Sequence, residues 1–446
     1  MKPQNKKKSK KSSIPTTSLG RAGKLFGTGL ALIGKEVAVR TLDAVTRLAD
    51  DDRLQKRLAQ ATDLVNALSQ MKGAAMKTGQ LLSLEFSDLL PPEVTEVLRK
   101  LHDDSTFLPI DQIQKILMKE LGRELFEQIK DLSEEPVSAA SIGQVHSAFI
   151  RGEKVAIKIQ FPGVDKTIAA DLALVKQTLR SVLWLQSKSV PLEGFFEECE
   201  RVLRQEVDYS KEARFLAKFA DLVGTSTAYA VPKVYEDFSS KRVLVLSYME
   251  GQRLRDWLKD PGTEASRQHF AGLVLDLLFK EFFEWGLVQT DPNFGNFLFR
   301  QEDGRLVLLD FGACNAYSKK FRGEILSLLR AAMARDDETL LRLAAELSIL
   351  DPRESDVTKT GFCNMMQLIV SVFREESQPF NFADSDYLNR IRTTTLSFAA
   401  SVKYTAPAKD LIFLNRKLGG MFHLLKDLGI QRDINVSWRK IDALGF

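Results

Sequence analysis

Three polar residues at fixed spacing constrain this chain more than any other feature of its sequence. Within residues 288–313, Asp291 is followed five positions later by Asn296, and Asp310 comes fourteen positions after that, at the head of an Asp-Phe-Gly triplet. Carboxylate and amide oxygens are the ligands that Mg²⁺ prefers, and a separate carboxylate can orient an attacking hydroxyl or water. The pattern predicts that Asn296 and Asp310 bind Mg²⁺ and that Asp291 is catalytic.

A hairpin predicted between these residues would bring the two metal ligands together. Two short apolar runs, 297–300 and 306–309, flank the turn sequence Glu302-Asp303-Gly304, which is typical of two antiparallel strands. Such a hairpin would hold Asn296 and Asp310 at one end, on opposite arms. Either half of the pattern alone would also fit an ordinary acidic turn, so the interpretation depends on a lysine further upstream.

That lysine is Lys158, which lies in the apolar run Val155-Ala156-Ile157-Lys158. The preceding residues 137–149 are small and then alternate, which predicts a strand, a loop and a second strand. Protein kinases cover and grip the phosphates of ATP with such a loop and lysine, so we predict that ATP binds here. We expect His146 to pack within this hairpin. The predicted cofactor-binding residues of the loop are Ala139, Ala140, Ser141, Gly143 and Val145.

A lysine in an apolar strand needs a compensating charge. We predict one helix over residues 192–220 that carries Glu206, Asp208 and Glu212, with Asp208 and Glu212 one turn apart on the same face. One of the three carboxylates should pair with Lys158, and the residues themselves do not decide which.

The segments around this helix complete the expected fold. We predict helices over 109–121, 122–129 and 171–187, and strands over 232–238 and 243–247. Tyr248 and Met249 then begin a linker whose backbone could bind a flat base. Only about ten residues separate Asp310 from a helix predicted over 321–334. The Ala-Pro-Glu motif of ordinary protein kinases is absent, which leaves little room for a peptide substrate.

Charge and composition bear on partners. The residues through Arg40 include ten basic and one acidic residue, a charge of +9, so the rest of the chain carries −5 of the total of +4. A basic tail indicates either an anionic partner or a solubilising disordered segment. No aromatic residue lies among the lysines of residues 2–24 to stack on bases, so we expect lipid rather than nucleic acid. The three cysteines lie far apart without metal spacing, and no run of eighteen apolar residues predicts a membrane span.

A helical segment near the N-terminus contains Met76-Lys77-Thr78-Gly79-Gln80. Lys77 and Gln80 are three residues apart and share one helix face, and Gly79 between them allows close backbone approach. By itself this pattern also fits an exposed helix surface.

With these motifs in this order, the chain closely resembles the UbiB/ADCK family of atypical kinase-like proteins of ubiquinone biosynthesis. The resemblance implies an α+β, bilobal, protein-kinase-like fold with a helical N-terminal extension. It further implies ATP binding with Mg²⁺ and slow ATPase activity at a membrane surface, and it places Lys77 and Gln80 over the active site near Glu206 and Asp208. The sequence departs from the family at Ser138, where a third alanine is usual, and it lacks the C-terminal membrane helices of some bacterial members.

We therefore expect a disordered basic tail over 1–20, a helical extension over 21–130, a kinase-like N-lobe over 131–250 and a helical C-lobe over 251–446. The expected function is a Mg-dependent ATPase that supports quinone biosynthesis or lipid handling. The alternatives are a small-molecule phosphotransferase and a catalytically silent scaffold. Expected partners are anionic membranes, quinone precursors and proteins of quinone biosynthesis. The expected location is cytoplasmic and peripheral to a membrane, with a mitochondrial location as the alternative.

Overall fold

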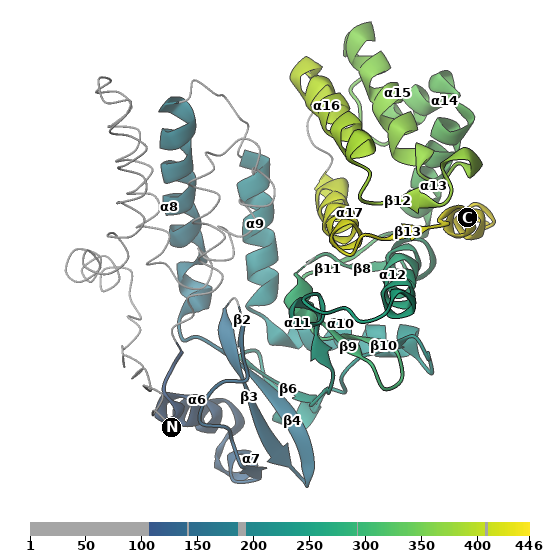
Figure 1. Ribbon diagram of the computed structural model, residues 1–446. Coiled ribbons are helices and arrows are strands. Elements are labelled where there is room, and N and C mark those ends of the chain that lie inside the picture. The colour runs from purple at the N-terminus through teal and green to yellow at the C-terminus, as the bar shows by residue number, and fades with distance from the viewer. Residues whose placement is uncertain (1–106, 141, 186–192, 292, 406–408) are drawn as a thin grey trace, which may run out of the picture. The chain divides into compact units, whose positions relative to one another are not determined.

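The computed structural model describes residues 107–446 except 141, 186–192, 292 and 406–408 (Figure 1). The chain divides into two compact units. Unit 1 holds the described residues up to Arg214 together with Lys233–Tyr248, and unit 2 holds Phe215–Pro232 and Met249–Phe446. The predicted basic tail, the predicted helices before residue 107, and Lys77 with Gln80 lie outside the described residues.

Unit 1 is built on a five-stranded antiparallel sheet in which β3 and β4 are neighbours over their whole length (Figure 1). Its strand order is β1-β3-β4-β6, with β2 also paired to β3. The side chains of Val155, Ile157 and Ile159 on β4 are fully buried. Since successive side chains of a strand alternate between faces, Lys158 lies on the opposite face. The strands are β1 (Ile129–Lys130), β2 (Ser138–Ala140), β3 (Gly143–Ile150), β4 (Glu153–Gln160) and β6 (Val243–Ser247).

The helices of unit 1 confirm some sequence predictions and correct others. The helix predicted over 122–129 is wrong beyond Phe126, because Ile129 pairs with Ile150 in the sheet. The strand predicted over 232–238 is reduced to a single bridge between Val234 and Leu246, followed by a 3₁₀ turn. The helical elements are α6 (Ile110–Leu121), α7 (Arg123–Phe126), α8 (Val164–Leu185), α9 (Glu193–Glu206), α10 (Tyr209–Val223, which continues into unit 2) and η1 (Glu236–Phe238).

Unit 2 combines short sheets with many helices. A four-stranded sheet has the order β5-β10-β9-β7, and two further pairs join β11 to β8 and β12 to β13. The strands are β5 (Tyr229–Ala230), β7 (Gln252–Arg253), β8 (Leu287–Gln289), β9 (Phe297–Arg300), β10 (Arg305–Leu308), β11 (Cys314–Ala316), β12 (Phe380–Asn381) and β13 (Gln431–Arg432).

The helices of unit 2 begin with caps that the sequence supplies. Thr263, Ser318 and Ser355 each accept a hydrogen bond from the backbone N–H three residues later, which satisfies a donor that the first helical turn leaves open. The helical elements are α11 (Leu254–Trp257), α12 (Glu264–Phe279), the π-helical turn η2 (Lys280–Trp285), η3 (Phe294–Asn296), α13 (Lys319–Ala334), α14 (Asp337–Glu346), α15 (Asp356–Ser371), η4 (Glu375–Ser377), α16 (Ser385–Ser401), α17 (Lys409–Asp427) and α18 (Asn435–Asp442).

One hydrophobic cluster of unit 2 supports the predicted catalytic loop. It joins Phe282 and Phe283 of η2 and Val288 of β8 to α13, α17 and α18. Gly286 ends η2 with a left-handed φ of 66°, and a Cβ there would lie 2.8 Å from the carbonyl oxygen of Tyr317. The cluster fixes the direction in which the chain enters the loop.

None of the helices in the described part of the chain is both long enough and apolar enough to cross a membrane.

Candidate active site

Strand β8 ends at Gln289, two residues before Asp291, and fixes the start of the predicted catalytic loop. It pairs antiparallel with β11, with Gln289 opposite Cys314. The backbone N–H and the hydroxyl of Thr290 both donate to the carbonyl oxygen of Ala313, at 2.8 and 3.0 Å. The side-chain amide of Gln289 donates to the carbonyl oxygen of Asp291 at 3.0 Å. These bonds tie the loop to the segment that follows the Asp-Phe-Gly triplet.

The sequence analysis missed this support. Its signal is a pair of polar residues, Gln289 and Thr290, at the end of an apolar strand and directly before Asp291. A third missed contact involves Phe219, on the part of α10 that belongs to unit 2. Its ring centroid lies 4.6 Å from that of Phe311 in the Asp-Phe-Gly triplet, and no local pattern indicates that contact.

The predicted hairpin is confirmed as β9 and β10, although β10 ends at Leu308 rather than Leu309. Phe297 pairs with Leu308, and the backbone N–H of Leu309 donates to the carbonyl oxygen of Asn296 at 3.0 Å. Asn296 is therefore opposite Leu309, and Asp310 is the next residue on the facing arm. The fold brings the two predicted metal ligands to one end of the hairpin.

The donor set at this end suits Mg²⁺. The Asn296 side chain is 8% exposed, and its amide nitrogen is buried without a hydrogen-bond partner among the described residues. An unsatisfied buried amide is unusual and is consistent with a group whose partners arrive with a ligand. Asp310 supplies a carboxylate whose Oδ1 accepts the Gly312 N–H at 2.8 Å. In the described residues no three His, Cys, Asp or Glu side chains form a metal cluster.

Unit 1 carries the predicted phosphate-binding lysine. The Lys158 ammonium donates to both carboxylate oxygens of Glu212, each at 2.9 Å. The Lys158 and Glu212 side chains are 13% and 2% exposed, and the Lys158 nitrogen lies 5.0 Å from the centre of the Tyr209 ring. The structure thus answers a question that the sequence left open, because Glu212 is the carboxylate that pairs with Lys158.

The helix predicted over 192–220 is wrong, because it is two helices. α9 ends at Glu206 and α10 begins at Tyr209. Asp208 precedes α10, where its Oδ1 accepts the Ser210 N–H at 3.2 Å, so it does not share a helix with Glu212. Aspartate favours such capping positions because its short side chain competes for backbone N–H groups. Glu206 is 7% exposed at the end of α9.

The predicted phosphate-covering loop connects β2 to β3. Ala139 and Ala140 belong to β2, where they pair with Gln144 and Gly143. Ser141, which follows β2 in the sequence, lies outside the described residues.

Gly143 is required at the start of β3 by a close approach between strands. A Cβ added there would lie 2.2 Å from the backbone oxygen of Ile159 on β4, far below a normal contact. Two residues later, Val145 pairs with Lys158. The register therefore places the loop and the lysine on neighbouring strands.

The predicted base-binding linker starts where the chain leaves unit 1. Tyr248 is the last residue of unit 1 and Met249 belongs to unit 2. The backbone N–H of Tyr248 donates to the carbonyl oxygen of Lys154 at 3.0 Å, and the Lys154 ammonium lies 4.0 Å from the centre of the Tyr248 ring.

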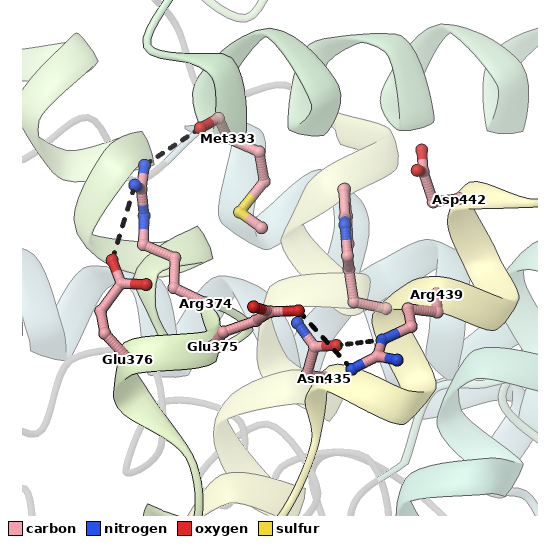
Figure 2. A pocket seen from close by; sticks show the side chains of 8 residues that line it. Met333, Arg374, Glu375, Glu376, Asn435, Arg439 and Asp442 are labelled. Atoms are coloured by element: carbon pink, nitrogen blue, oxygen red, sulfur yellow. Dashed lines mark hydrogen bonds and ion pairs between the residues drawn. The ribbon is translucent and has the colours of Figure 1, made fainter.

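A cavity of about 510 Å³ lies elsewhere in unit 2 and contains none of the predicted site residues (Figure 2). Each of its charged groups has a partner, which for Asp442 is Arg330 outside the lining. Arg374 donates to the Met333 carbonyl oxygen and lies 3.9 Å from Glu376, and Arg439 lies 3.7 Å from Glu375. We assign it no chemistry, because it presents no unmatched charge.

Comparisons with known proteins identify the family of this chain. The family model described as the ABC1 atypical kinase-like domain matches residues 100–344. The chain belongs to the ABC1 atypical kinase-like family. The matched part includes Lys158, Glu212, Asp291, Asn296 and Asp310.

Individual ABC1 relatives extend the likeness over most of the chain. The mitochondrial atypical kinase coq-8 of Caenorhabditis elegans is 31% identical over 94% of this chain, which spans 57% of that protein. The mitochondrial atypical kinase COQ8 of Saccharomyces cerevisiae is 29% identical over 94% of this chain and 84% of its own length. The solved complex of Rv3197 with erythromycin, from Mycobacterium tuberculosis, has a TM-score of 0.59 and 27% identity, covering 90% of this chain and 100% of that one. The kinase-like fold expected from the sequence is confirmed.

Proposed function

We propose that this ABC1 protein binds Mg·ATP and turns it over slowly, in support of quinone biosynthesis at a membrane surface. The observation that carries the proposal is the buried ion pair of Lys158 with Glu212, together with a hairpin that brings Asn296 next to Asp310. A lysine held by both oxygens of a carboxylate keeps a fixed position while its charge offsets phosphate charge.

Each residue has a distinct role in this proposal. Asn296 and Asp310 would hold Mg²⁺, which when bound neutralises charge on the phosphates. Lys158 binds phosphate oxygens, and Glu212 orients it. Asp291 accepts a proton from the attacking hydroxyl or water. Gln289 and Thr290 hold the backbone of the Asp291 loop in place.

The short segment after Asp310 argues against a protein acceptor. α13 begins at Lys319, and the pairing of β11 with β8 takes up three of the intervening residues. An extended peptide would need a longer platform there. Water or a small molecule is therefore the proposed acceptor.

Product stoichiometry distinguishes the competing functions. Purified protein is incubated with Mg·ATP, and ADP and free phosphate are both measured. An ATPase yields equal amounts of the two, whereas a phosphotransferase supplied with its acceptor yields more ADP than free phosphate. Asp291→Asn should lower the rate by roughly 10²–10⁴-fold. Failure of the parent protein to form ADP would favour the scaffold alternative.

The roles of Lys77 and Gln80 remain predictions from the resemblance. If they cover the site and exclude large acceptors, Lys77→Ala and Gln80→Ala should change the rates of ATP turnover and autophosphorylation without changing the thermal stability of the protein. Rates equal to those of the parent in both variants would indicate that Lys77 and Gln80 belong to an ordinary exposed helix surface.

A further inference from the structure

Two fully buried polar side chains, Gln144 and His146, join three backbone segments of unit 1. Both residues lie on β3 and are 0% exposed. Gln144 immediately follows Gly143, at the end of the predicted phosphate-covering loop. The sequence analysis gave His146 only a packing role and gave Gln144 none.

The Gln144 side chain makes contacts on two sides. On one side its Oε1 accepts the Leu108 backbone N–H at 2.8 Å, and its Nε2 donates to the Leu108 carbonyl oxygen at 3.3 Å. On the other side Nε2 lies 2.7 Å from Nε2 of His146. The second imidazole nitrogen, Nδ1, lies 2.7 Å from the carbonyl oxygen of Ser133. The contacts form a continuous chain from Leu108 to Ser133.

The hydrogen-bond chemistry of this chain fixes one protonation state. A carbonyl oxygen only accepts, so Nδ1 of His146 carries the proton that it donates to Ser133. Nε2 then has a lone pair and accepts an N–H of Gln144. This leaves Oε1 of Gln144 facing the Leu108 N–H, which is the observed contact. Every group is satisfied only while His146 is neutral.

A protonated His146 would break this arrangement. Its Nε2 would become a donor facing the Gln144 NH₂ group. Rotation of the amide would satisfy the imidazolium but would turn the NH₂ group toward the Leu108 N–H, where two donors would meet. The charge of His146 and the anchoring of Leu108 therefore exclude each other.

Burial keeps His146 neutral. Desolvation lowers the pKa of His146 below its ordinary value of 6.5, and the hydrogen bond to the Ser133 carbonyl opposes this only in part. The folded state therefore binds this proton less readily than the unfolded state. The stability that depends on neutral His146 is complete above pH 6.5 and is lost as the pH falls from there toward the lower folded-state pKa.

The charged groups of the neighbouring segments do not offset this effect. His146 on β3 pairs with Ile157 on β4, so the two side chains share one face of the sheet. The two lysines of β4, Lys154 and Lys158, lie on the opposite face. On α6, Glu120 is half-buried and pairs with Arg242 at 3.4 Å. The other charged groups of the adjacent segments are exposed: Asp111, Lys115 and Lys119 on α6, Lys130 on β1, and Asp131, Glu134 and Glu135 beside Ser133.

We propose that Gln144 and His146 are positioning residues that couple the chain segment entering at Leu108 to the phosphate-covering loop. Leu108 lies two residues before α6, whose Glu120 accepts hydrogen bonds from Ser240 and Arg242. A displacement at Leu108 is therefore transmitted to Gln144 rather than absorbed by α6. The effect on nucleotide binding rests on the proposed function, whereas the coupling itself does not.

The coupling is tested by hydrogen exchange followed by mass spectrometry on the full chain without nucleotide. Peptides that contain Leu108 and residues 138–145 are followed in the parent protein and in Gln144→Leu. We expect faster exchange in both peptides, by about tenfold or more for the Leu108 amide, which loses the buried acceptor that Gln144 supplies. Unchanged exchange at Leu108 would overturn the proposal, whether or not the protein binds ATP.

The dependence on neutral His146 is tested through the KM for ATP between pH 5 and 8. We expect the KM of the parent to rise as the pH falls toward the folded-state pKa of His146, which lies below 6.5, while kcat changes less. His146→Gln retains an acceptor for Gln144 but cannot titrate, so its KM should stay level. Gln144→Glu is nearly isosteric and would stabilise the imidazolium, so its transition should move to higher pH.

His269→Gln is the matched control, because His269 is exposed and contacts only the Gly304 carbonyl oxygen among the hydrogen bonds described for it. It should keep the pH profile of the parent. A parent profile that His146→Gln leaves unchanged would contradict the proposed role of His146. If no variant binds ATP, the proposed function fails, and the exchange experiment still decides the coupling.

Discussion

A buried ion pair in unit 2 provides a quantitative test of the fold. Lys417 on α17 pairs with Glu281 on η2, and the two side chains are 0% and 1% exposed. Burial lowers the pKa of Lys417 well below its ordinary value. The Glu281 Oε1 atom is buried without a hydrogen-bond partner among the described residues, so Lys417 supplies the counter-charge on which this carboxylate depends.

Lys417→Met would retain most of the buried volume but leave Glu281 without its counter-charge. Removal of one partner from a buried pair typically costs about 3–5 kcal/mol. For a unit of this size, each kcal/mol corresponds to roughly 2–4 °C. We therefore expect the unfolding midpoint of unit 2 to fall by roughly 6–20 °C, measured by differential scanning calorimetry, which resolves the transitions of separate units.

Two further variants separate the loss of charge pairing from the loss of packing. Glu281→Leu combined with Lys417→Met removes both charges and should restore most of the stability, since apolar replacements of buried pairs are often neutral or stabilising. Arg342→Met is the control for an exposed pair, because Arg342 and Glu346 are 58% and 57% exposed. It should cost less than about 0.5 kcal/mol. The reasoning is refuted if Lys417→Met costs no more than this control.

Three other predictions follow from the site and the tail. Gly143→Ala should destabilise unit 1 by roughly 1–3 kcal/mol, because the added Cβ would meet the Ile159 backbone oxygen. Gly194→Ala in α9 is the control, because open space surrounds Gly194. Equal thermal midpoints for the two variants would contradict the expected clash. Thr290→Val keeps the backbone hydrogen bond to Ala313 but loses the hydrogen bond of the hydroxyl. The kcat for ATP turnover should therefore fall, while the free energy of unfolding drops by only about 1 kcal/mol. An unchanged kcat would argue against a positioning role for Thr290. Deletion of residues 1–40, which carry the charge of +9, should reduce flotation with anionic liposomes at low salt and leave Mg·ATP binding intact. Equal flotation of the parent and the truncated protein would exclude the tail as the membrane contact.

The sequence predicted features that depend on local pattern. The functional role proposed for Lys158 could be predicted because a charged residue in an apolar strand is conspicuous. The hairpin between Asn296 and Asp310 could be predicted because its turn and its two strands are contiguous in the sequence. The choice of Glu212 was not predictable, since it depends on a helix break at Asp208 that resembles an ordinary helical turn in the sequence.

Contacts between segments that are distant in the sequence could not be predicted, for a different reason. The pairing of β11 with β8, and with it the role of Thr290, joins strands that are too short to show periodicity. The link from Gln144 to Leu108 spans 36 residues and depends on burial, which no single sequence window contains. The split of the predicted strand 232–238 into a bridge and a 3₁₀ turn likewise depends on the edge of the sheet against which it lies.

The central claim is that Asp310 and Asn296 hold the metal of a Mg·ATP complex. Thermal unfolding of the parent, Asp310→Asn and Asp303→Asn should be compared with and without Mg·ATP. Asp303 is a suitable control because it lies in the turn of the same hairpin and pairs with Arg300. At about 100 times Kd the ligand should stabilise the parent and Asp303→Asn by about 2.7 kcal/mol, and it should have no effect on Asp310→Asn. An undiminished Mg·ATP shift in Asp310→Asn would contradict the account.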